Sequence, residues 1–369
     1  MSRFELHRRD PIVAMRTELL PRADRSKMRY ENDKEGIMKP HVTVIVLNWN
    51  GWQDTLQCLD SLTQQDYQNM SIIVVDNAST DGSQDHILTW PENGGKVWMR
   101  RQFVIDAATP ESPLPDTLQN GDYVFIQSGI NGGFAAGNNL GIRLALKHQA
   151  VYVWILNNDT EVHPAALDAL VSCSEGDLAI GMCGSILIYH DSRNQIQACG
   201  GGNFDYWRAS GRQIGHGLDP QEKLNAILAT PLTYIAGASL LARAEMIRDV
   251  GAFEERYFLY YEEIDWAERA KAWKMAVAPE SIVYHKEGAS IGTSDRGRRS
   301  VLSQYYLSRN LLLFYARFHK TLFPVAMVRV LRELWLQMRM GERQLVSATW
   351  RALIDGVLLR EGRVDFKKS

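Results

Sequence analysis

The chain has 369 residues, 45% of them hydrophobic and 23% charged, which is typical of a globular protein with one large domain or two ordinary ones. Its four cysteines form no CxxC pair, and no stretch reaches the roughly 18 apolar residues of a membrane-spanning helix, which argues against a disulfide framework, a zinc site and an integral membrane protein. The net charge of −2 hides an asymmetry, because residues 296–369 carry fifteen Lys and Arg against five Asp and Glu.

The first elements form a strand, a helix and a second strand. Residues 1–38 mix basic and acidic side chains without a long apolar run, so we predict a flexible leader rather than a signal peptide. The segment HVTVIVLNWNG (41–51) has the β-branched run of a strand covered on both faces. Leucines at helical spacing in 52–65 predict a helix, and SIIVVD (71–76) predicts the next strand. Together they indicate a right-handed parallel crossover.

Two further strands are predicted from DYVFIQS (122–128) and YVWILNN (152–158). A helix should lie between them and begin near Ala135. This alternation predicts an α/β fold with a Rossmann-like, mostly parallel open sheet flanked by helices. Such sheets bind ligands at the carboxyl ends of their strands. Four polar residues lie at or just past such ends: Asn48, Asp76, Asn131 and Asp159.

The second half of the chain is less regular. Residues 189–231 are rich in glycine and predict loops or a short ribbon over a site. A strand and a helix ending at Gly251 should follow. We predict a catalytic domain over 39–297, with one half at about 39–162 and the other at about 163–297. Residues 298–369 then form a basic amphipathic helical tail.

The apolar run in YVWILNNDTEV (152–162) ends in Asn157, Asn158 and Asp159. Residues two apart on an extended strand face the same way, so Asn157 and Asp159 present hard oxygen ligands together. These suit Mg²⁺ or Mn²⁺, which often share their coordination shell with substrate phosphates. The alternative is an Asn-Asn-Asp turn that binds no metal.

Asp76 lies in VVDNASTDGS, directly after the second predicted strand. An acidic residue at this place can hold a ribose hydroxyl or a base N–H. The alternative is a helix cap, in which Ser79 or Asp81 starts the next helix through local hydrogen bonds.

The segment NGGFAAGNN (131–139) places small residues just before a predicted helix. Glycines there let backbone N–H groups approach a phosphate or a sugar. The spacing matches neither the dinucleotide fingerprint nor the P-loop, and a glycine-rich loop without a ligand is the alternative.

A cluster of acidic side chains lies in FLYYEEIDWAERAKAWKM (258–275), which contains Glu262, Glu263, Asp265 and Glu268. Carboxylates crowded together have a raised proton affinity, which suits a general base. The alternative is a helix N-terminus, where the helix dipole favours acidic residues.

His285 ends another predicted strand, SIVYH (281–285). One of its ring nitrogens could bind a metal ion. The alternative is a histidine with a purely structural role.

The order of these motifs resembles that of the family 2 glycosyltransferases. The match runs through VIVLNWNG, VVDNASTDGS, NGGFAAGNNLGI, LNNDTEV, the acidic cluster and YHKEGAS, from about His41 to Ser290. It is closest to the bacterial rhamnosyltransferase-like branch. The resemblance implies the GT-A fold, a nucleoside-diphosphate sugar as donor, a divalent cation (Mg²⁺ or Mn²⁺) and inversion at the anomeric carbon.

The resemblance also implies roles for single residues. LNNDTEV stands where the family has an Asp-x-Asp metal motif, so Asp159 is the expected main ligand, with Asn157 in place of the first acid and His285 completing the shell. Glu263 matches the second acid of the family's Glu-Asp pair and is the expected catalytic base, with Glu262 and Asp265 as supporting acids. The expected donor-binding residues are Asn48, Asn50, Asp76, Asn131, Gly133, Phe134 and Asn158.

The predicted partners are a dTDP- or UDP-linked sugar, rhamnose among the candidates, and a glycan or lipid-linked acceptor in cell-surface polysaccharide assembly. The tail either lies on the inner face of the cell membrane, which would make the protein cytoplasmic and peripheral, or packs on the catalytic domain or a second subunit as in a homodimer. No nucleic-acid partner is expected. Because Asn157 replaces an acid, a sugar-nucleotide-binding protein with impaired catalysis remains the alternative. A nucleotidyltransferase is disfavoured because NWNGWQD after the first strand has no basic residue.

Overall fold

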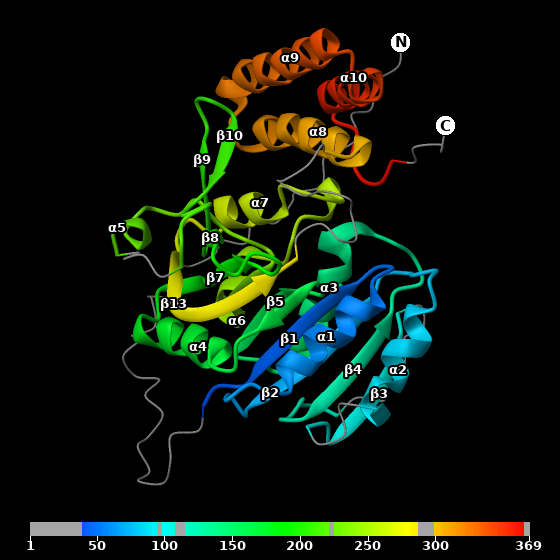
Figure 1. Cartoon of the computed structure of the whole chain (residues 1–369), viewed down its shortest axis with the longest axis vertical. Coiled ribbons are helices and arrows are strands. Elements are labelled where there is room, and N and C mark those ends of the chain that lie inside the picture. Colours follow the sequence, from blue (N-terminus) through cyan, green and yellow to red (C-terminus); the bar gives the residue numbers. More distant parts are fainter. Residues whose placement is uncertain (1–38, 94–97, 108–114, 221–224, 287–298, 365–369) are drawn as a thin grey trace, which may run out of the picture. The chain divides into compact units, whose positions relative to one another are not determined.

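The computed structural model describes residues 39–93, 98–107, 115–220, 225–286 and 299–364 (Figure 1). The predicted leader, residues 1–38, lies outside the described residues. The described residues from Pro40 onward pack as one compact unit.

The first half of this unit is a parallel sheet. Its strands lie in the order β3-β4-β2-β1-β5, and every neighbouring pair is parallel. Asn48 is opposite Asp76 in the register of the first two strands, so their polar tips meet at one edge. The elements are β1 (Val42–Asn48), α1 (Trp52–Leu62), β2 (Met70–Asp76), α2 (Ser83–Asn93), β3 (Arg101–Asp106), β4 (Asp122–Gln127), α3 (Gly133–Lys147) and β5 (Tyr152–Asn157).

The second half extends the same sheet with mixed strand directions. Beyond β5 the order is β12-β7-β13-β6, with β8 paired to β7, and only the β7–β13 pair is parallel. The elements are β6 (Thr160–Val162), α4 (Ala166–Gly176), β7 (Ile180–Tyr189), β8 (Ile196–Cys199), β12 (Ser239–Arg243), α6 (Ala244–Val250), η2 (Glu255–Tyr257), α7 (Glu262–Arg269) and β13 (Lys274–His285).

The predicted glycine-rich region forms a short ribbon. Its strands β9 (Gly201–Asp205), β10 (Ser210–Gln213) and β11 (Tyr234–Ile235) pair antiparallel in a separate sheet, beside the short helix α5 (Asn225–Leu228). Figure 1 shows this ribbon extending from the main sheet toward the C-terminal helices.

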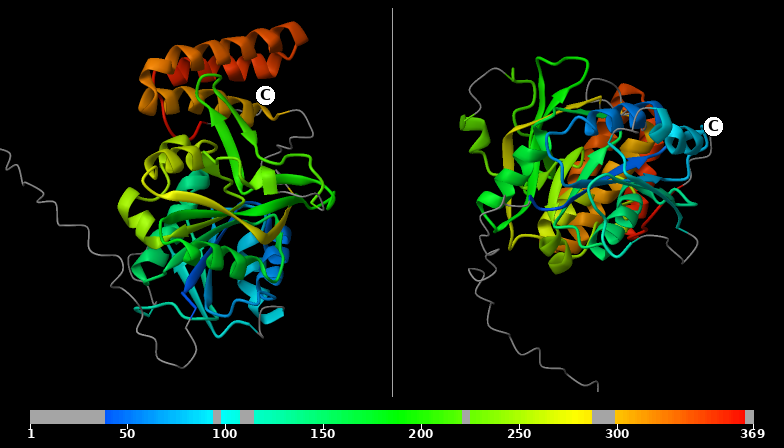
Figure 2. Two further views of the ribbon diagram at one scale, coloured as in Figure 1. Left: turned by 90° about the vertical axis from the view of Figure 1, so that its left-hand side faces the viewer. Right: turned by 90° about the horizontal axis from the view of Figure 1, so that it is seen from below.

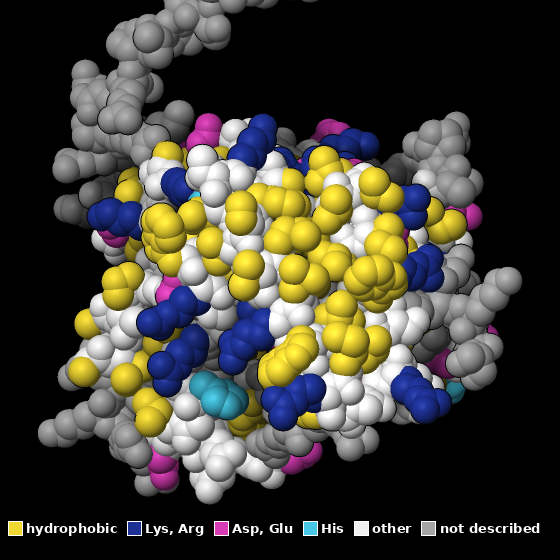
Figure 3. Space-filling model, turned by 90° about the horizontal axis from the view of Figure 1, so that it is seen from above, with side chains coloured by type: hydrophobic (Ala, Val, Ile, Leu, Met, Phe, Trp, Pro, Cys, Tyr) yellow, Lys and Arg dark blue, Asp and Glu magenta, His cyan; other side chains and the backbone are white. Residues whose placement is uncertain are grey.

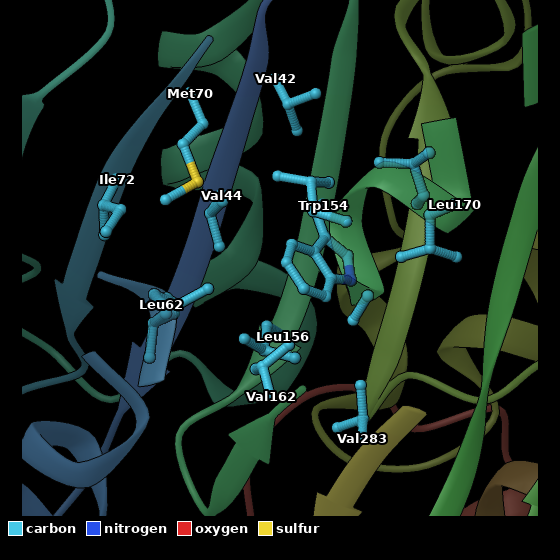
Figure 4. Close-up of a cluster of buried hydrophobic side chains, with 14 of the residues drawn as sticks. Val42, Val44, Leu62, Met70, Ile72, Trp154, Leu156, Val162, Leu170 and Val283 are labelled. Carbon is cyan, nitrogen blue, oxygen red and sulfur yellow. The ribbon is translucent and has the colours of Figure 1, made fainter. Parts of the chain in front are cut away.

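Both faces of the main sheet are covered, which explains the near-continuous apolar runs. Val44 and Val46 belong to the core shared with α1, α2 and α4, whereas Ile45 faces the core shared with α3, α6 and α7. Figure 4 shows the first of these cores, where Trp154 lies among side chains such as Leu156 and Val283. Because successive strand residues point to opposite faces, both faces of this sheet must carry apolar side chains.

The C-terminal region forms three helices, α8 (Val301–Phe318), α9 (Phe323–Met340) and α10 (Arg343–Val357), with the turn η3 (Lys320–Leu322) after the first. Figure 2 shows them gathered at one end of the sheet. Helix α8 is mostly buried and packs with the ribbon through Phe204 and with α7 through Tyr261. None of the described helices is long and apolar enough to cross a bilayer.

The structure confirms the α/β sheet with its C-terminal helical extension, and it adds strands β3 and β7, which the sequence analysis does not predict. Strand β3 is a short edge strand whose side chains are alternately half-buried and exposed, with the apolar Val104 on the exposed side. Helix α3 begins at Gly133, two residues before the predicted start.

Candidate active site

The carboxylate of Asp76 connects the tips of three neighbouring strands. It is fully buried at the end of β2 and accepts hydrogen bonds from β1, from β4 and from the turn after β2. A buried carboxylate requires such partners, because burial removes the water molecules that would otherwise hydrogen-bond to it. The donors are Asn48 Nδ2 (2.7 Å), Ser79 Oγ (2.6 Å), Ser79 N (3.1 Å) and Gln127 Nε2 (3.0 Å).

Asn48 and Asn158 belong to the same network. Thr55 Oγ1 donates to Asn48 Oδ1 at 2.7 Å, and Asn158 Nδ2 donates to Thr55 Oγ1 at 3.0 Å. Asn50, with a φ of +51°, accepts from the backbone N–H of Thr80 at 2.7 Å and holds the turn after β2 against β1. Four of the predicted donor-binding residues therefore lie together at the carboxyl ends of β1, β2 and β5.

The other three, Asn131, Gly133 and Phe134, form the start of α3. Asn131 Oδ1 accepts from Gly133 N at 2.9 Å, and Phe134 N donates to Phe258 O at 2.9 Å. Gly133 has a φ of +87°, and a Cβ at this position would lie 2.1 Å from Phe258 O. Only glycine fits there, so the loop before α7 can press directly on the start of α3.

Asp159, Asn157 and His285 meet where β5 ends and β13 ends. His285 Nε2 lies 3.1 Å from Asp159 Oδ1 and 3.3 Å from Asn157 Nδ2. His285 Nδ1 donates to Gln197 Oε1 at 2.8 Å, since an amide oxygen can only accept. When the ring is protonated, Nε2 donates to Asp159 as an imidazolium. In the neutral imidazole, the form that binds metals, the lone pair of Nε2 is directed at Asp159 and Asn157 instead.

The ionisation of Asp159 follows from this arrangement. Burial disfavours its charged form, but the nearby His285, backbone hydrogen bonding and the charge of Lys286 hold the pKa of the carboxyl below its ordinary value. Lys286 itself binds Asp54 at 2.6 Å. Asp159 is therefore available as an anionic ligand at neutral pH.

These three residues fit a divalent cation. They offer one carboxylate oxygen, one imidazole nitrogen and one amide oxygen, with Gln197 orienting the ring as a supporting residue does in metal sites. The Nδ2 atom of Asn157 faces the His285 ring, and a half-turn rotation of the side-chain amide would place Oδ1 there instead. Among the described residues no group of three or more His, Cys, Asp or Glu is close enough to form a metal site, so the set depends on Asn157.

The acidic pair stands at the start of α7, after a strained loop. Phe258, Tyr260 and Tyr261 have positive φ angles of +67°, +68° and +78°, and each such non-glycine residue costs about 1–3 kcal/mol. Strain of this size persists only where the surroundings enforce it. The helix then begins at Glu262 and aims Glu263 at the end of the sheet.

The two glutamates differ in environment. Glu262 is buried, and its Oε1 has no hydrogen-bond partner in the described part of the chain. Burial, and then the charge of Glu263, raises the pKa of Glu262 well above its ordinary value. Glu263 is half-buried and accepts from the backbone N–H of Gly237, and burial raises its pKa as well. Glu262 is the carboxyl whose protonated form its surroundings favour more strongly, because its Oε1 has no donor among the described residues whereas Glu263 accepts from Gly237.

Residues Gly237 and Ala238 join the metal-ligand set to the acidic pair. Asn157 N donates to Ala238 O at 3.1 Å, while a Cβ on Gly237 would lie 2.3 Å from Glu263 Oε1. Phe134 approaches the same glycine. The metal-ligand set, Glu263 and the start of α3 are thus connected by direct contacts near the strand ends.

Asp265 is placed differently from the pair. It is fully buried, and it accepts from Tyr257 at 2.9 Å and from Arg269 at 2.7 Å. Arg317 from α8 lies 3.1 Å from its other oxygen. These contacts fix α7 against its neighbours, so the structure does not bring Asp265 to the open side of the site.

The strained loop is held by two residues of α8. Asn310 Nδ2 donates to the carbonyls of Tyr257 (3.0 Å), Leu259 (2.7 Å) and Tyr260 (3.1 Å). Arg309 adds a bond to Tyr257 O at 2.7 Å. Both side chains are fully buried. We call these contacts the α8 clamp.

The sequence reasoning missed the α8 clamp and Gln197. Each acts on residues far away in the chain, and no local pattern marks it. Ser79 is the exception, because a serine three residues after Asp76 is a recognisable turn signal.

The fold is that of the GT-A glycosyltransferases. The mannosyltransferase PcManGT from Pyrobaculum calidifontis, solved with GDP-Man and Mn²⁺, superposes with a TM-score of 0.51 over 87% of each chain at 14% identity. At this identity the likeness speaks for the fold alone.

The sequence comparisons find similarity to one family of enzymes. The model for glycosyl transferase family 2 matches residues 43–102. An N-acetylglucosaminyl-diphospho-decaprenol L-rhamnosyltransferase of Mycobacterium tuberculosis is 24% identical over 272 residues, which are 69% of this chain and 78% of the relative. The low-salt glycan biosynthesis hexosyltransferase Agl10 of Haloferax volcanii is 26% identical over 49% of this chain and 57% of its own. The chain is thus similar to the family 2 glycosyltransferases and to a relative of their rhamnosyltransferase-like branch, which agrees with the resemblance that the motif order predicted.

The α8 clamp can be tested without knowing the substrate. Replacing Asn310 by Asp turns a donor into an acceptor that faces three carbonyls. We expect unfolding in urea to become easier by about 1–3 kcal/mol, the penalty for buried polar groups left unpaired. Hydrogen exchange should accelerate at residues 257–262. Ser308→Ala, on the same helix but without contact to the loop, should leave exchange there unchanged. Unaltered hydrogen exchange at residues 257–262 in Asn310→Asp would show that the loop keeps its conformation without the α8 clamp.

Proposed function

We propose that the protein is an inverting glycosyltransferase that moves a sugar from a nucleoside-diphosphate donor to an acceptor hydroxyl. The observation that carries the proposal is the joining of Asp159, Asn157 and His285 to Glu263 through Gly237 and Ala238 at the carboxyl ends of the strands. A site of this kind brings a cation-binding group and a base to one place. The relatives named above are transferases, which favours this function over a binding protein with impaired catalysis.

The donor would lie along the strand ends. Asn48, Asn50, Asp76 and Asn158 would surround the nucleoside, and the start of α3 at Asn131, Gly133 and Phe134 would face the sugar and phosphates. Asp76 already has four donors, so it would bind a base or ribose by exchanging one of them, the side chain of Ser79 or Gln127 being the more exposed choice. We propose a dTDP- or UDP-linked sugar, with rhamnose as the first candidate.

Glu263 would act as the base. Its carboxylate would take the proton of an acceptor hydroxyl while that oxygen bonds to the anomeric carbon. The bond from that carbon to the phosphate oxygen breaks, and the nucleoside diphosphate leaves from the opposite face. The Gly237 N–H would keep Glu263 oriented, and neutral Glu262 would avoid placing a second charge beside it.

Asp159, His285 and Asn157 would hold a Mg²⁺ or Mn²⁺ ion. When bound, such an ion supplies positive charge beside the two donor phosphates and so stabilises the departing group. Gln197 would keep His285 in the tautomer that presents Nε2.

The acceptor is proposed to be a glycan or a lipid-linked glycan, as in cell-surface polysaccharide assembly. The mycobacterial relative is named for an acceptor on a polyprenol, which supports a lipid carrier here. With such an acceptor the protein would work in the cytoplasm, at the inner face of the cell membrane.

A thermal-shift screen tests the proposed function. dTDP-rhamnose, UDP-glucose, UDP-galactose and GDP-mannose are each added with and without Mn²⁺. We expect one dTDP or UDP donor to raise the melting temperature only when the ion is present, and His285→Ala to abolish the effect of the ion. Stabilisation without the ion would contradict the proposed metal set. No shift with any donor would contradict the proposed donor site.

The role of Glu263 is tested by Glu263→Gln. Removing a positioned base typically lowers the rate by about 10² to 10⁴. We expect kcat to fall within that range while donor binding, measured by the same thermal shift, survives. Glu262→Gln is the matched control, because an amide resembles a protonated carboxyl, and its loss should stay below about tenfold. A large loss of kcat in Glu262→Gln with a small loss in Glu263→Gln would show that Glu262 is the base.

The raised pKa of Glu263 predicts a pH dependence. A base must be ionised to accept a proton, so kcat/KM should be constant at high pH and fall as the pH drops through the pKa of Glu263. Because burial raises that pKa, the fall should begin at a higher pH than for an exposed glutamate. A pH profile from 4 to 9 measures it, with donor binding followed in parallel. A flat profile down to pH 4.5 would argue against a buried carboxylate base.

A further inference from the structure

Helices α9 and α10 carry an unusual concentration of exposed apolar side chains. Eleven of the fifteen large hydrophobic side chains exposed among the described residues lie between Val328 and Leu359. Trp335 is 50% exposed, Met338 53% and Trp350 54%. Figure 3, viewed from the side of these helices, shows the hydrophobic side chains gathered into one broad patch with Lys and Arg around it. Soluble surfaces seldom have apolar patches of this kind without a binding partner.

The patch is a second apolar face, separate from the core contact. On α9 the side chains of Ala326, Val330 and Leu334 are buried against the protein, at the expected helical spacing. Val328, Leu331, Trp335 and Met338 form a stripe on the opposite side of the same helix. Trp350 and Ile354 continue the exposed surface on α10. We call these six exposed residues, from Val328 to Ile354, the apolar face.

The charges around the apolar face are nearly all positive. Arg332, Arg339 and Arg343 are exposed, and none has a carboxylate partner in the described part of the chain. The Arg339 guanidinium lies 4.8 Å from the centre of the Trp335 ring, at the edge of the face. Two carboxylates of these helices are engaged, since Glu333 pairs with Arg299 and Arg329, and the buried Asp355 pairs with Arg351 and Arg360. Glu342, the half-buried residue before α10, is the carboxylate that remains beside the three arginines.

We propose that the apolar face and its arginines bind an anionic lipid bilayer. Tryptophans and leucines inserted at headgroup depth, with arginines directed to lipid phosphates, are the features of a helix that lies in a membrane interface. A second copy of this chain fits less well, because a face-to-face dimer would bring the three arginines of each copy together with only Glu342 of each copy to offset their charge. The choice of a membrane as the partner rests on the proposed function. The inference deepens that function, because it names the surface through which the protein would reach a lipid-linked acceptor.

Helix α8 connects this face to the site. It packs against both α9 and α10 on one side, and its Arg309 and Asn310 hold the loop before Glu262 on the other. A bilayer on the apolar face would therefore lie one helical layer from the acidic pair. That arrangement would fix the distance between the membrane surface and the base.

The proposal is tested by cosedimentation of the full chain with vesicles, in the absence of any donor. Vesicles of phosphatidylcholine alone are compared with vesicles that contain 30% phosphatidylglycerol. We expect binding to the anionic vesicles that weakens as salt is raised, and little binding to the neutral ones. Arg332→Gln with Arg343→Gln should weaken it by roughly 25-fold, at roughly fivefold for each basic residue. Trp335→Glu with Met338→Glu should abolish it.

Matched changes on other surfaces serve as controls. Arg248→Gln on α6 and Leu178→Glu, a leucine that is 52% exposed after α4, should bind vesicles like the wild type. Circular dichroism checks that each variant is folded. Vesicle binding that survives the α9 changes would overturn the proposal. A second result would also overturn it. In that case light scattering shows that the wild type is a dimer, Trp335→Glu converts it to monomers, and the wild type does not bind vesicles. Because no donor is present, a failure here is separate from a failure of the transferase proposal.

Discussion

The site depends on the hold that α8 has on the strained loop from Tyr257 to Tyr261. Three backbone angles in that loop are unfavourable for residues with side chains, and a free chain would relax them. The amide of Asn310 prevents this by bonding three carbonyls at once, and Phe258 stacks on Tyr306 of the same helix with ring centres 5.1 Å apart. The same loop contacts the start of α3 through Phe258 O. Asn310, together with Arg309 and Tyr306, thus holds the loop that leads into α7 and the acidic pair.

Electrostatics divides the polar residues of the site into two kinds. Asp76 and Asp265 are buried and saturated with donors, so they connect elements and hold their shape. Asp159, Glu263 and His285 retain lone pairs that are directed toward the sheet edge. Burial alone does not separate the two kinds, because Asp159 is nearly as buried as Asp265. The number of protein donors on each carboxylate separates the two kinds, since a carboxylate with four partners can bind a substrate only by exchanging one of them.

The C-terminal helices show how similar sequence patterns serve different purposes. Helices α8 and α9 are both rich in leucine, aromatic residues and arginine, and α10 carries the same mixture more sparsely. Helix α8 is buried on nearly all sides, and its Arg309 bonds backbone carbonyls within the protein. Helices α9 and α10 bury only one stripe each and leave tryptophans and arginines exposed. The predicted tail begins at residue 298 and therefore includes α8. Helix α8, however, packs against the ribbon and the loop before α7, so it is part of the same compact unit as the sheet.

Much of the fold follows from the sequence alone. The β-branched runs that predict β1, β2, β4 and β5 reflect a parallel sheet covered on both faces, and polar residues at their ends mark the edge where ligands bind. The order of the motifs was enough to predict the family. The sequence proposed Ser79 or Asp81 as a helix cap. The structure gives that contact to Asp81, which accepts from Ser83 N, whereas Ser79 donates to Asp76.

Tertiary structure alone decided which acidic residues face the site and what supports them. Glu262, Glu263 and Asp265 have similar sequence surroundings, yet Arg269 and Arg317 enclose the third, and Gly237 gives the second its hydrogen-bond donor. Gln197 reaches His285 from β8, and Asn310 reaches the loop from α8, 50 or more residues away in the chain. Local periodicity reports which side of an element is buried, because burial repeats with the turn of the helix or the pleat of the strand. It does not report which distant side chain packs there, since that depends on how the elements are brought together in space.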